Sequence, residues 1–222
     1  MDNDTTSGKE GHFKILKDFS DKKADILVGT QMVAKGHDFP AVTLVGILDA
    51  DMSLYFSDYR SGERTYQLIT QVAGRSGRAD KKGKVVLQTY NPENEVLRFA
   101  INYDYVGFFE REKAVRKSTN FPPYSLVLRI MVEADDDKAA MEGLKEVYFR
   151  VKEVYDRERD KFTFFNKMKC PVKRIKNKYR YEILMRIPPD DKRLKDEIYN
   201  LALKDKRQGV LTYVEENPSN LY

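Results

Sequence analysis

Apolar positions in the first 90 residues fall into short continuous runs separated by helical patterns. The segments "ADILVGT" (24–30), "VTLVGILDAD" (42–51) and "GKVVLQTY" (83–90) are typical of strands buried on both faces. A helical spacing precedes the first run in "GHFKILKDFS" (11–20), and another lies between the second and third in "ERTYQLITQVAGR" (63–75). Buried strands that alternate with helices indicate a parallel α/β sheet, in which ligands contact the loops at the carboxyl ends of the strands.

The pattern changes beyond residue 118. Residues 91–117 have helical spacing, and Pro122 and Pro123 in "STNFPPYS" cannot continue a helix, so they mark a predicted domain boundary. The segments expected beyond them are a strand (125–134), a helix (137–158), two strands paired around an Asn177-Lys178 turn (172–176 and 179–187), a helix (191–206) and a strand (209–216). This order is typical of a ferredoxin-like α+β domain. We therefore predict one domain over residues 1–118 and a second over residues 119–222.

Composition excludes several classes of protein. The chain has 222 residues, of which 41% are hydrophobic and 34% charged, and this mixture is typical of globular domains. Its single cysteine, Cys170, rules out a disulfide framework or a multi-cysteine zinc site within the chain. No apolar run approaches the roughly 20 residues that span a bilayer, and the first residues lack the apolar core of a signal peptide. We expect a cytoplasmic protein with no membrane partner.

The segment "QVAGRSGR" (71–78) carries the first chemical signal. On a helix, Gln71, Arg75 and Arg78 share one face because they are spaced by four and three residues. Gly74 and Gly77 each cost about 0.5–1 kcal/mol relative to alanine inside a helix, so close approach to a ligand is one reason for them. The planar guanidinium groups suit the charge on phosphate oxygens. The alternative is a basic, solvated helix end with a glycine stop.

A second motif, "GTQMVAKGHDFP" (29–40), lies ahead of the arginines. The ordered pair resembles motifs V and VI of superfamily 2 helicases. Together with "LDADMSLYFSDYRSGER", "GKVVLQTYNPENEVL" and "FPPYS", it resembles the carboxy-terminal part of the PriA family of primosomal replication-restart DNA helicases, over essentially the whole chain. The resemblance implies a RecA-like parallel-sheet helicase lobe 2, truncated at its amino terminus, followed by the α+β ferredoxin-like domain.

The resemblance also assigns roles to residues. Arg75 and Arg78 would be arginine fingers that meet the γ-phosphate of ATP, and Gln71 would orient their helix. Gly36 and Asp38 would lie beside the nucleotide. Thr30 would contact the DNA backbone, with Gln31 and Lys35 as further contacts. Asp38 as a helix cap and Lys35 as a solvated side chain remain alternatives.

The family implies an ATP-dependent helicase that recognises stalled or branched forks and promotes primosome assembly. The chain lacks the phosphate-binding loop of P-loop NTPases, so ATP and Mg²⁺ would be held mainly by a lobe 1 outside it. The family's zinc would likewise lie in a cysteine-rich segment outside this chain. We expect the chain to be inactive by itself. The alternative is a self-standing nucleic-acid-binding or regulatory module derived from a helicase lobe.

A basic stretch in the second domain is a candidate for DNA contact. Lys173, Arg174 and Lys176 occur beside Tyr179 with no acidic residue between them, and basic residues beside aromatic ones bind phosphates and stack on bases. The alternative is that the lysines protect an edge strand from pairing with other chains. By resemblance, the partners would be branched and single-stranded DNA, primosome proteins and single-strand-binding protein.

Overall fold

The structure is a computed structural model that describes residues 9–30, 42–56, 58–74, 83–204 and 207–221. It divides into two compact units, one formed by Met1–Phe56 with Arg60–Glu110 and the other by Ser57–Tyr59 with Arg111–Tyr222. The predicted division between residues 118 and 119 stays a prediction. No helix among the described residues has the length and apolar content needed to cross a membrane.

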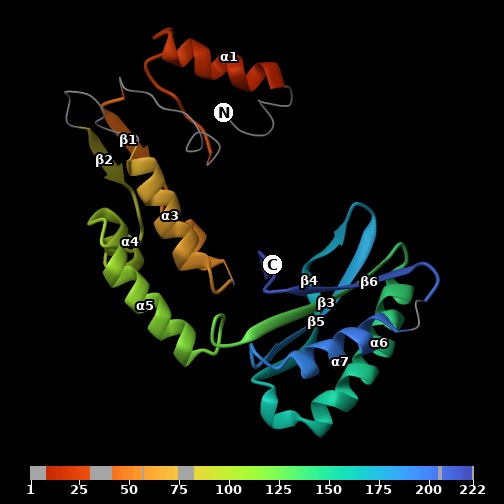
Figure 1. The fold of residues 1–222 in the computed structure, drawn as a ribbon. Coiled ribbons are helices and arrows are strands. Elements are labelled where there is room, and N and C mark those ends of the chain that lie inside the picture. The colour runs from red at the N-terminus through yellow and green to blue at the C-terminus, as the bar shows by residue number, and fades with distance from the viewer. Residues whose placement is uncertain (1–8, 31–41, 57, 75–82, 205–206, 222) are drawn as a thin grey trace. The chain divides into compact units, whose positions relative to one another are not determined.

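The first unit contains a parallel pair of strands with helices around it (Figure 1). Strand β1 pairs with β2 in parallel, from Leu44 opposite Lys84 to Ile47 opposite Leu87, which confirms the predicted parallel sheet. In the core of the first unit, α3 packs against α4, whose Leu97 and Ala100 are fully buried. The elements are α1 (Lys9–Ser20), β1 (Leu44–Ile47), the 3-10 helix η1 (Met52–Tyr55), α3 (Ser61–Ala73), β2 (Lys84–Leu87), α4 (Glu95–Ile101) and the start of α5 (Tyr105–Ser118).

One prediction for this unit, a strand over residues 24–30, was wrong. Residues 26–29 form no strand, and Ile26 and Val28 are 78% and 73% exposed. A short apolar run becomes a strand only where its backbone finds a partner, and periodicity alone does not show one. The helical pattern predicted over residues 91–117 is confirmed and corresponds to two helices, α4 and α5, because Tyr103 adopts a left-handed backbone (φ 54°) between them. Asp104 then caps the second helix by accepting a hydrogen bond from the amide of Gly107 (2.8 Å).

The second unit has the predicted βαββαβ order. Its four strands form an antiparallel sheet in the order β4-β5-β3-β6, the arrangement of a ferredoxin-like domain. Helices α6 and α7 cover one face of this sheet (Figure 1). The elements are β3 (Leu126–Ala134), α6 (Asp137–Arg157), the 3-10 helix η2 (Arg159–Lys161), β4 (Phe164–Ile175), β5 (Lys178–Ile187), α7 (Lys192–Leu203) and β6 (Val210–Glu216).

The core of the second unit surrounds its central strand, β3. Leu128 and Ile130 on β3 are fully buried against Ile183 and Met185 of β5, and both α6 and α7 contribute apolar side chains to the same cluster. The opposite face of β3 is also buried, but it includes charged residues such as Arg129 at 6% exposure. A substitution on either face of β3 that changes the volume of a side chain should therefore destabilise the second unit.

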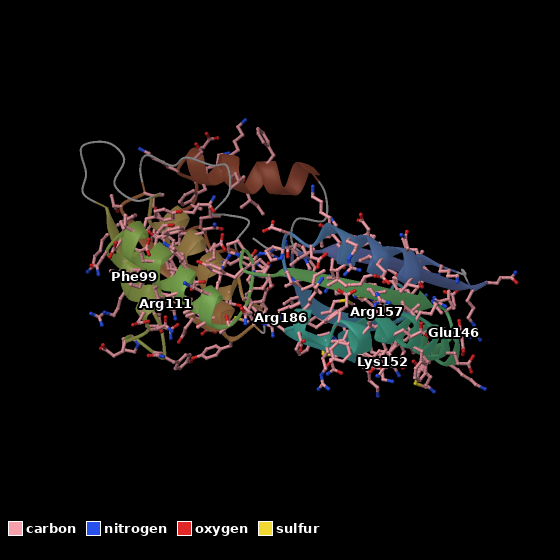
Figure 2. All side chains as sticks on the ribbon, turned by 60° about the horizontal axis from the view of Figure 1, so that its bottom comes forward. Phe99, Arg111, Glu146, Lys152, Arg157 and Arg186 are labelled. Atoms are coloured by element: carbon pink, nitrogen blue, oxygen red, sulfur yellow. The ribbon has the colours of Figure 1, made fainter. Side chains whose placement is uncertain are left out.

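An ion cluster joins the end of α6 to the start of α7. Glu158 accepts hydrogen bonds from Arg193, from Lys161 (2.9 Å) and from Arg157 (3.3 Å), and Arg157, which projects from α6 in Figure 2, also pairs with Glu197 (2.6 Å). The bond from Arg193, followed by the bond from Lys161, lowers the pKa of Glu158 to about 2. The carboxylate therefore stays ionised at neutral pH, and this contribution to stability is lost as the pH falls below about 4.5 toward 2.

Replacing a core side chain tests this description of the second unit. Ile183→Ala removes most of a fully buried side chain and leaves a cavity, so the free energy of unfolding should fall by about 2–5 kcal/mol in urea denaturation. Leu211→Ala is the control, because Leu211 is 53% exposed and should change the free energy by less than about 0.5 kcal/mol. Equal effects of the two variants would contradict the placement of the core.

Candidate functional site

The carboxyl ends of β1 and β2 lie at one edge of the parallel pair, where a nucleotide site is expected. Hydrogen bonds join the loops that follow the two strands. The amide of Asp49 donates to Oε1 of Gln88 (2.7 Å), and the amide of Ala50 donates to the carbonyl oxygen of Gln88 (3.0 Å). The amides of Tyr90 and Asn91 donate to Oδ2 of Asp51 at 3.1 and 3.2 Å. The two loops are therefore held together as one surface.

Asp51 is the centre of this arrangement and is only 1% exposed. Its burial alone would raise the pKa of the carboxyl group, but the bonds from the Thr89 side chain and from the amides of Tyr90 and Asn91 outweigh it and hold the pKa below its usual range. Asp51 is thus an ionised acceptor whose Oδ2 binds backbone amides, while its buried Oδ1 has no hydrogen-bond partner among the described residues. Among the described residues, no group of three or more His, Cys, Asp and Glu side chains is placed to hold a metal ion.

Helix α3 leads toward the arginine motif and is firmly seated in the first unit. The hydroxyl of Ser61 donates to the carbonyl oxygen of Phe56 (2.8 Å), and the hydroxyl of Thr65, fully buried, donates to the carbonyl oxygen of Ser61 (2.8 Å). Tyr66 and Ile69 pack into the core. The helix ends at Ala73, within the motif and two residues before Arg75.

The structure places only some of the predicted nucleotide and DNA contacts. Gln71 lies on α3 and is exposed, and Thr30 is exposed at the end of the irregular segment after α1. Gly74 caps α3, and a Cβ there would lie 3.3 Å from the carbonyl oxygen of Thr70, so the helix end itself favours a small residue. The predicted contacts outside the described residues are Gln31, Lys35, Gly36, Asp38, Arg75 and Arg78.

The basic stretch forms the tip of the β4–β5 hairpin. Lys176 and Asn177 form the two-residue turn, one residue earlier than predicted, with positive φ angles of 48° and 66° that fit a type I′ turn. Arg174 lies opposite Tyr179 in the register, and its guanidinium carbon is 5.0 Å from the centre of that ring. The ammonium nitrogen of Lys173 is 5.4 Å from the same ring. The hairpin therefore gathers the predicted DNA contacts Lys173, Arg174, Lys176 and Tyr179 at one end of the sheet.

Carboxylates from other elements neutralise part of this positive charge. Lys173 pairs with Asp137 (2.7 Å), whose pKa is lowered by its bonds from Lys173 and from the Tyr181 hydroxyl. Lys178 pairs with Asp135 (3.2 Å). These acids lie on α6 and before it, so the sequence around the hairpin did not reveal them. Over the described part of the chain, no carboxylate lies within ion-pair distance of Arg174 or Lys176, and both side chains are exposed.

Further lysines extend the basic surface beside the hairpin. Lys167 and Lys169 of β4 and Lys145 of α6 line a shallow hollow of about 160 Å³ together with Tyr181. The ammonium group of Lys167 lies 4.3 Å from the ring centre of Tyr148. Lys145 was missed from the sequence because it lies 19 residues before the start of β4, and only the packing of α6 on the sheet brings it there.

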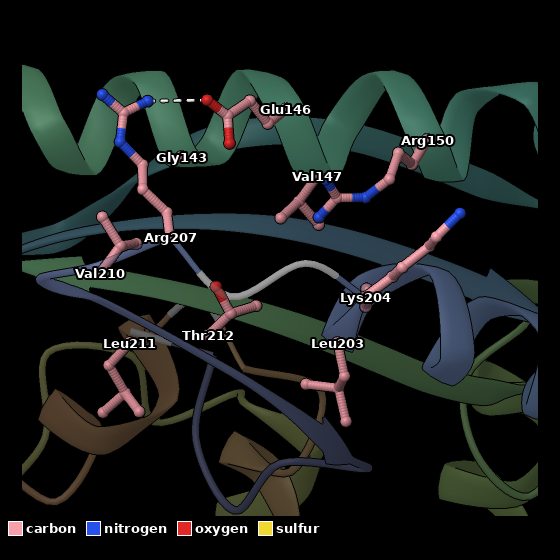
Figure 3. A pocket seen from close by; sticks show the side chains of 11 residues that line it. Gly143, Glu146, Val147, Arg150, Leu203, Lys204, Arg207, Val210, Leu211 and Thr212 are labelled. Carbon is pink, nitrogen blue, oxygen red and sulfur yellow. Dashed lines mark hydrogen bonds and ion pairs between the residues drawn. The ribbon is translucent and has the colours of Figure 1, made fainter.

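A second hollow, of about 80 Å³, lies between α6, the end of α7 and β6 (Figure 3). Its arginines are already engaged. Arg207 binds Glu142 (2.5 Å) and Glu146 (2.7 Å), and Arg150 donates to the carbonyl oxygen of Leu201 (3.0 Å). Both arginines of the hollow are therefore held by groups of the second unit itself.

The buried polar groups of the sheet are not arranged for catalysis. Burial, followed by the nearby charge of Glu182, raises the pKa of the Cys170 thiol to about 12, so the nucleophilic thiolate is not formed at neutral pH. Burial also raises the pKa of Glu182, which lies 3.9 Å from Arg129. Arg129 in turn binds Glu215 (2.8 Å). These groups compensate one another within the sheet.

Comparisons with known proteins agree with the division into two kinds of domain. Residues 4–80 match the family model described as the helicase conserved C-terminal domain, and residues 117–218 match the primosomal protein N C-terminal domain. The replication restart protein PriA of Bacillus subtilis (strain 168) is 37% identical over 98% of this chain and 27% of its own length. The protein of the same name from Haemophilus influenzae is 34% identical over 100% of this chain and 30% of its own length. The chain thus spans less than a third of the length of these relatives.

The role assigned to Asp51 can be tested by amide hydrogen exchange. Asp51→Ala removes the acceptor for two backbone amides, so exchange at Tyr90 and Asn91 should accelerate relative to the parent chain. Because the pKa of Asp51 is lowered, its protecting effect should persist at neutral pH and fade on acidification below the usual carboxylate range. Asp21→Ala, an exposed carboxylate after α1, is the control and should leave both amides unchanged. Unchanged exchange rates at Tyr90 and Asn91 in Asp51→Ala would show that Asp51 does not join the two loops.

Proposed function

The chain belongs to the PriA family of replication restart proteins, and from this premise we propose that it forms the second motor lobe and the C-terminal domain of an ATP-dependent DNA helicase acting at stalled or branched forks. One observation carries the proposal. A helicase C-terminal domain and a primosomal C-terminal domain follow each other in one chain that is similar to PriA proteins along 98–100% of its length.

In this proposal, the first unit supplies one side of an ATP site. Arg75 and Arg78 would stabilise the charge that develops on the γ-phosphate, and Gly36 and Asp38 would lie beside the nucleotide. Two features support the assignment. Helix α3 is anchored by the buried hydrogen bond from Thr65 to Ser61 and ends two residues before Arg75. The loops joined through Asp51 lie at the carboxyl edge of the strands.

The remainder of the ATP site would come from a different lobe. The chain contains no phosphate-binding loop of the P-loop type, so ATP and Mg²⁺ would be held mainly by lobe 1. When bound, the metal would neutralise charge on the phosphates. The chain alone would therefore be inactive as an ATPase.

The second unit would contribute a DNA-binding surface. Arg174 and Lys176 present exposed positive charge at the hairpin tip, and Tyr179 lies beside them. Thr30, Gln31 and Lys35 of the first unit would contact the sugar-phosphate backbone of the DNA during unwinding. Branched and single-stranded DNA would be the substrates, and primosome proteins and single-strand-binding protein the partners.

Arg78→Ala tests the arginine-finger role. The change is made in a chimera in which this chain replaces the matching 27% of the Bacillus subtilis relative, so that a nucleotide-binding lobe is present. Arginine fingers contribute roughly 10³–10⁵ in rate, so DNA-stimulated ATP hydrolysis should fall by about that factor. The measurement is kcat with saturating DNA.

The matched control is Arg98→Ala, which removes an exposed arginine of α4 in the same unit and should leave kcat near that of the parent chimera. A near-normal rate in Arg78→Ala would refute the finger role. A parent chimera that binds DNA but hydrolyses no ATP would instead favour a module that binds nucleic acid without acting as a motor.

Neutralising the hairpin tip tests the DNA-binding role. Replacing Arg174 and Lys176 by glutamine should weaken binding of the chain to forked DNA. If both residues contact phosphates, the slope of log affinity against log salt should become shallower by about 1.4–1.8, because each phosphate contact contributes about 0.7–0.9. Fluorescence anisotropy over a range of salt concentrations measures both quantities.

The control for this pair is the double change Arg159→Gln and Lys192→Gln. It removes the same charge from exposed positions near the first residue of β4 and after the last residue of β5, at the end of the hairpin opposite the turn. Affinity and salt slope should match the parent chain. If the variant with Arg174 and Lys176 replaced also had the affinity and salt slope of the parent chain, the basic residues at the hairpin tip would instead protect an edge strand from pairing with other chains.

A further inference from the structure

An exposed aromatic ring on α6 lies beside a lysine of β4. The ring of Phe149 is 61% exposed, and it meets the ring of Tyr148 edge-on with centres 5.8 Å apart. The ammonium nitrogen of Lys167 lies 4.3 Å from the Tyr148 ring centre and 5.9 Å from that of Phe149. The aromatic pair therefore presents one open ring to the solvent with a positive charge next to it.

This ring adjoins the shallow hollow of about 160 Å³ between α6 and β4. Lys167 belongs to both, because it lines the hollow and contacts the two rings. Apolar and aromatic side chains line most of the hollow, namely Met141, Leu144, Met168 and Tyr181. A single exposed ring is ordinary on a protein surface, but a ring that continues into an apolar hollow indicates a contact surface.

The lysines around the hollow are not neutralised. Over the described part of the chain, no carboxylate lies within ion-pair distance of Lys145, Lys167 or Lys169, and all three side chains are exposed. By contrast, Lys152, farther along α6, pairs with Asp156 (2.6 Å). The surface therefore combines uncompensated positive charge with an apolar lining.

The stripe formed by Phe149, Lys145, Lys167 and Lys169 leads toward the hairpin tip. In the pairing of β4 with β5, Lys167 lies opposite Ile183 and Lys169 opposite Tyr181, so both lysines lie on the face that α6 covers. The same strand then continues to Lys173 and Arg174. The stripe and the tip therefore form one continuous basic surface along an edge of the sheet.

Single-stranded nucleic acid has the chemistry that this stripe would bind. Its phosphates pair with lysines, and its unpaired bases can stack on an exposed ring. A duplex presents phosphates to a protein but keeps its bases stacked on one another, so it would leave the ring and the apolar lining without a partner.

We propose that the stripe on α6 and β4 is a binding site for single-stranded DNA, in which Phe149 stacks on a base and Lys145, Lys167 and Lys169 contact phosphates. The inference rests on the proposed function, to which it adds a site for the unpaired strand. The hairpin tip would hold phosphates of the fork, and the stripe would hold the strand that has left the duplex.

A tryptophan placed at position 149 tests this site directly, because the chain contains no other tryptophan. Phe149→Trp keeps an aromatic ring at an exposed position, and stacking of a base on an indole quenches its fluorescence. An oligothymidylate of about 20 nucleotides, longer than the site of a typical single-strand-binding fold, should quench the emission of the full chain. A blunt duplex of the same length should leave the emission unchanged.

The affinity for the oligothymidylate gives a second measurement. Phe149→Ala should weaken binding by about 5- to 150-fold in fluorescence anisotropy, which is the usual loss when one stacked base loses its aromatic partner. Replacing Lys145 and Lys167 by glutamine should make the slope of log affinity against log salt shallower by about 1.4, because each contact with a single strand contributes about 0.7. All three side chains are exposed, so these variants should stay folded.

Matched controls use Leu211 of β6, which is 53% exposed and lies on the strand at the other edge of the sheet. Leu211→Trp should not be quenched by the oligothymidylate, and Leu211→Ala should keep the parent affinity. Equal quenching of Leu211→Trp and Phe149→Trp would overturn the inference, because binding would then not be confined to the stripe.

The outcomes separate this inference from the proposed function. If neutralising Arg174 and Lys176 weakens binding of forked DNA while Phe149→Trp is not quenched, the stripe is not a DNA site and the role of the hairpin tip stands. If Phe149→Trp is quenched while that neutralised variant keeps the parent affinity for forked DNA, the role of the tip fails and the stripe remains. Equal quenching by the duplex, or quenching by an acidic peptide and not by the oligothymidylate, would overturn the single-strand assignment.

Discussion

The register between β3 and β5 is the constraint on which the second unit depends. Nine residue pairs, from Leu126 opposite Ile187 to Ala134 opposite Tyr179, fix which side chains face the helices. A slip of one residue would turn every side chain of β5 to the other face of the sheet. Ile183 and Met185 would then leave the core, and Glu182 would replace them under α6 and α7. The apolar core on the helix-covered face therefore excludes the shifted register.

The pairing of β5 with its other neighbour, β4, positions both groups to which we assign DNA contact. Next to the turn it places Tyr179 opposite Arg174. Farther along the strands it places Lys167 opposite Ile183, on the face that α6 covers. The hairpin tip and the stripe on α6 and β4 thus follow each other along one edge of the sheet. Their spacing is fixed by β5, since its interior is buried and leaves little room for local movement.

Sequence patterns predicted the order of helices and strands well. They did not predict which apolar runs find a partner strand or which side chains form ion pairs. The alternation of β3 and β5 and the helical spacing of α6 and α7 depend on local periodicity, so the ferredoxin-like arrangement could be predicted. The run at residues 26–29 has the same apolar content as a buried strand, yet pairing is not local information and the run forms none. The lysines of the hairpin show the same limit. Their acidic partners Asp135 and Asp137 lie more than 30 residues away, and only the folded sheet brings them together.

The segment between β1 and α3 is held from two directions by contacts of different strength. At its start, Asp51 binds the amides after β2 and fixes the segment to the parallel strands. Near its end, Tyr59 stacks on Phe121. Buried, ionised hydrogen bonds resist displacement more than the sliding of one ring over another, because an unpaired buried carboxylate is far more costly than an offset stack. The segment is therefore fixed more firmly at Asp51, next to the parallel strands, than at Tyr59.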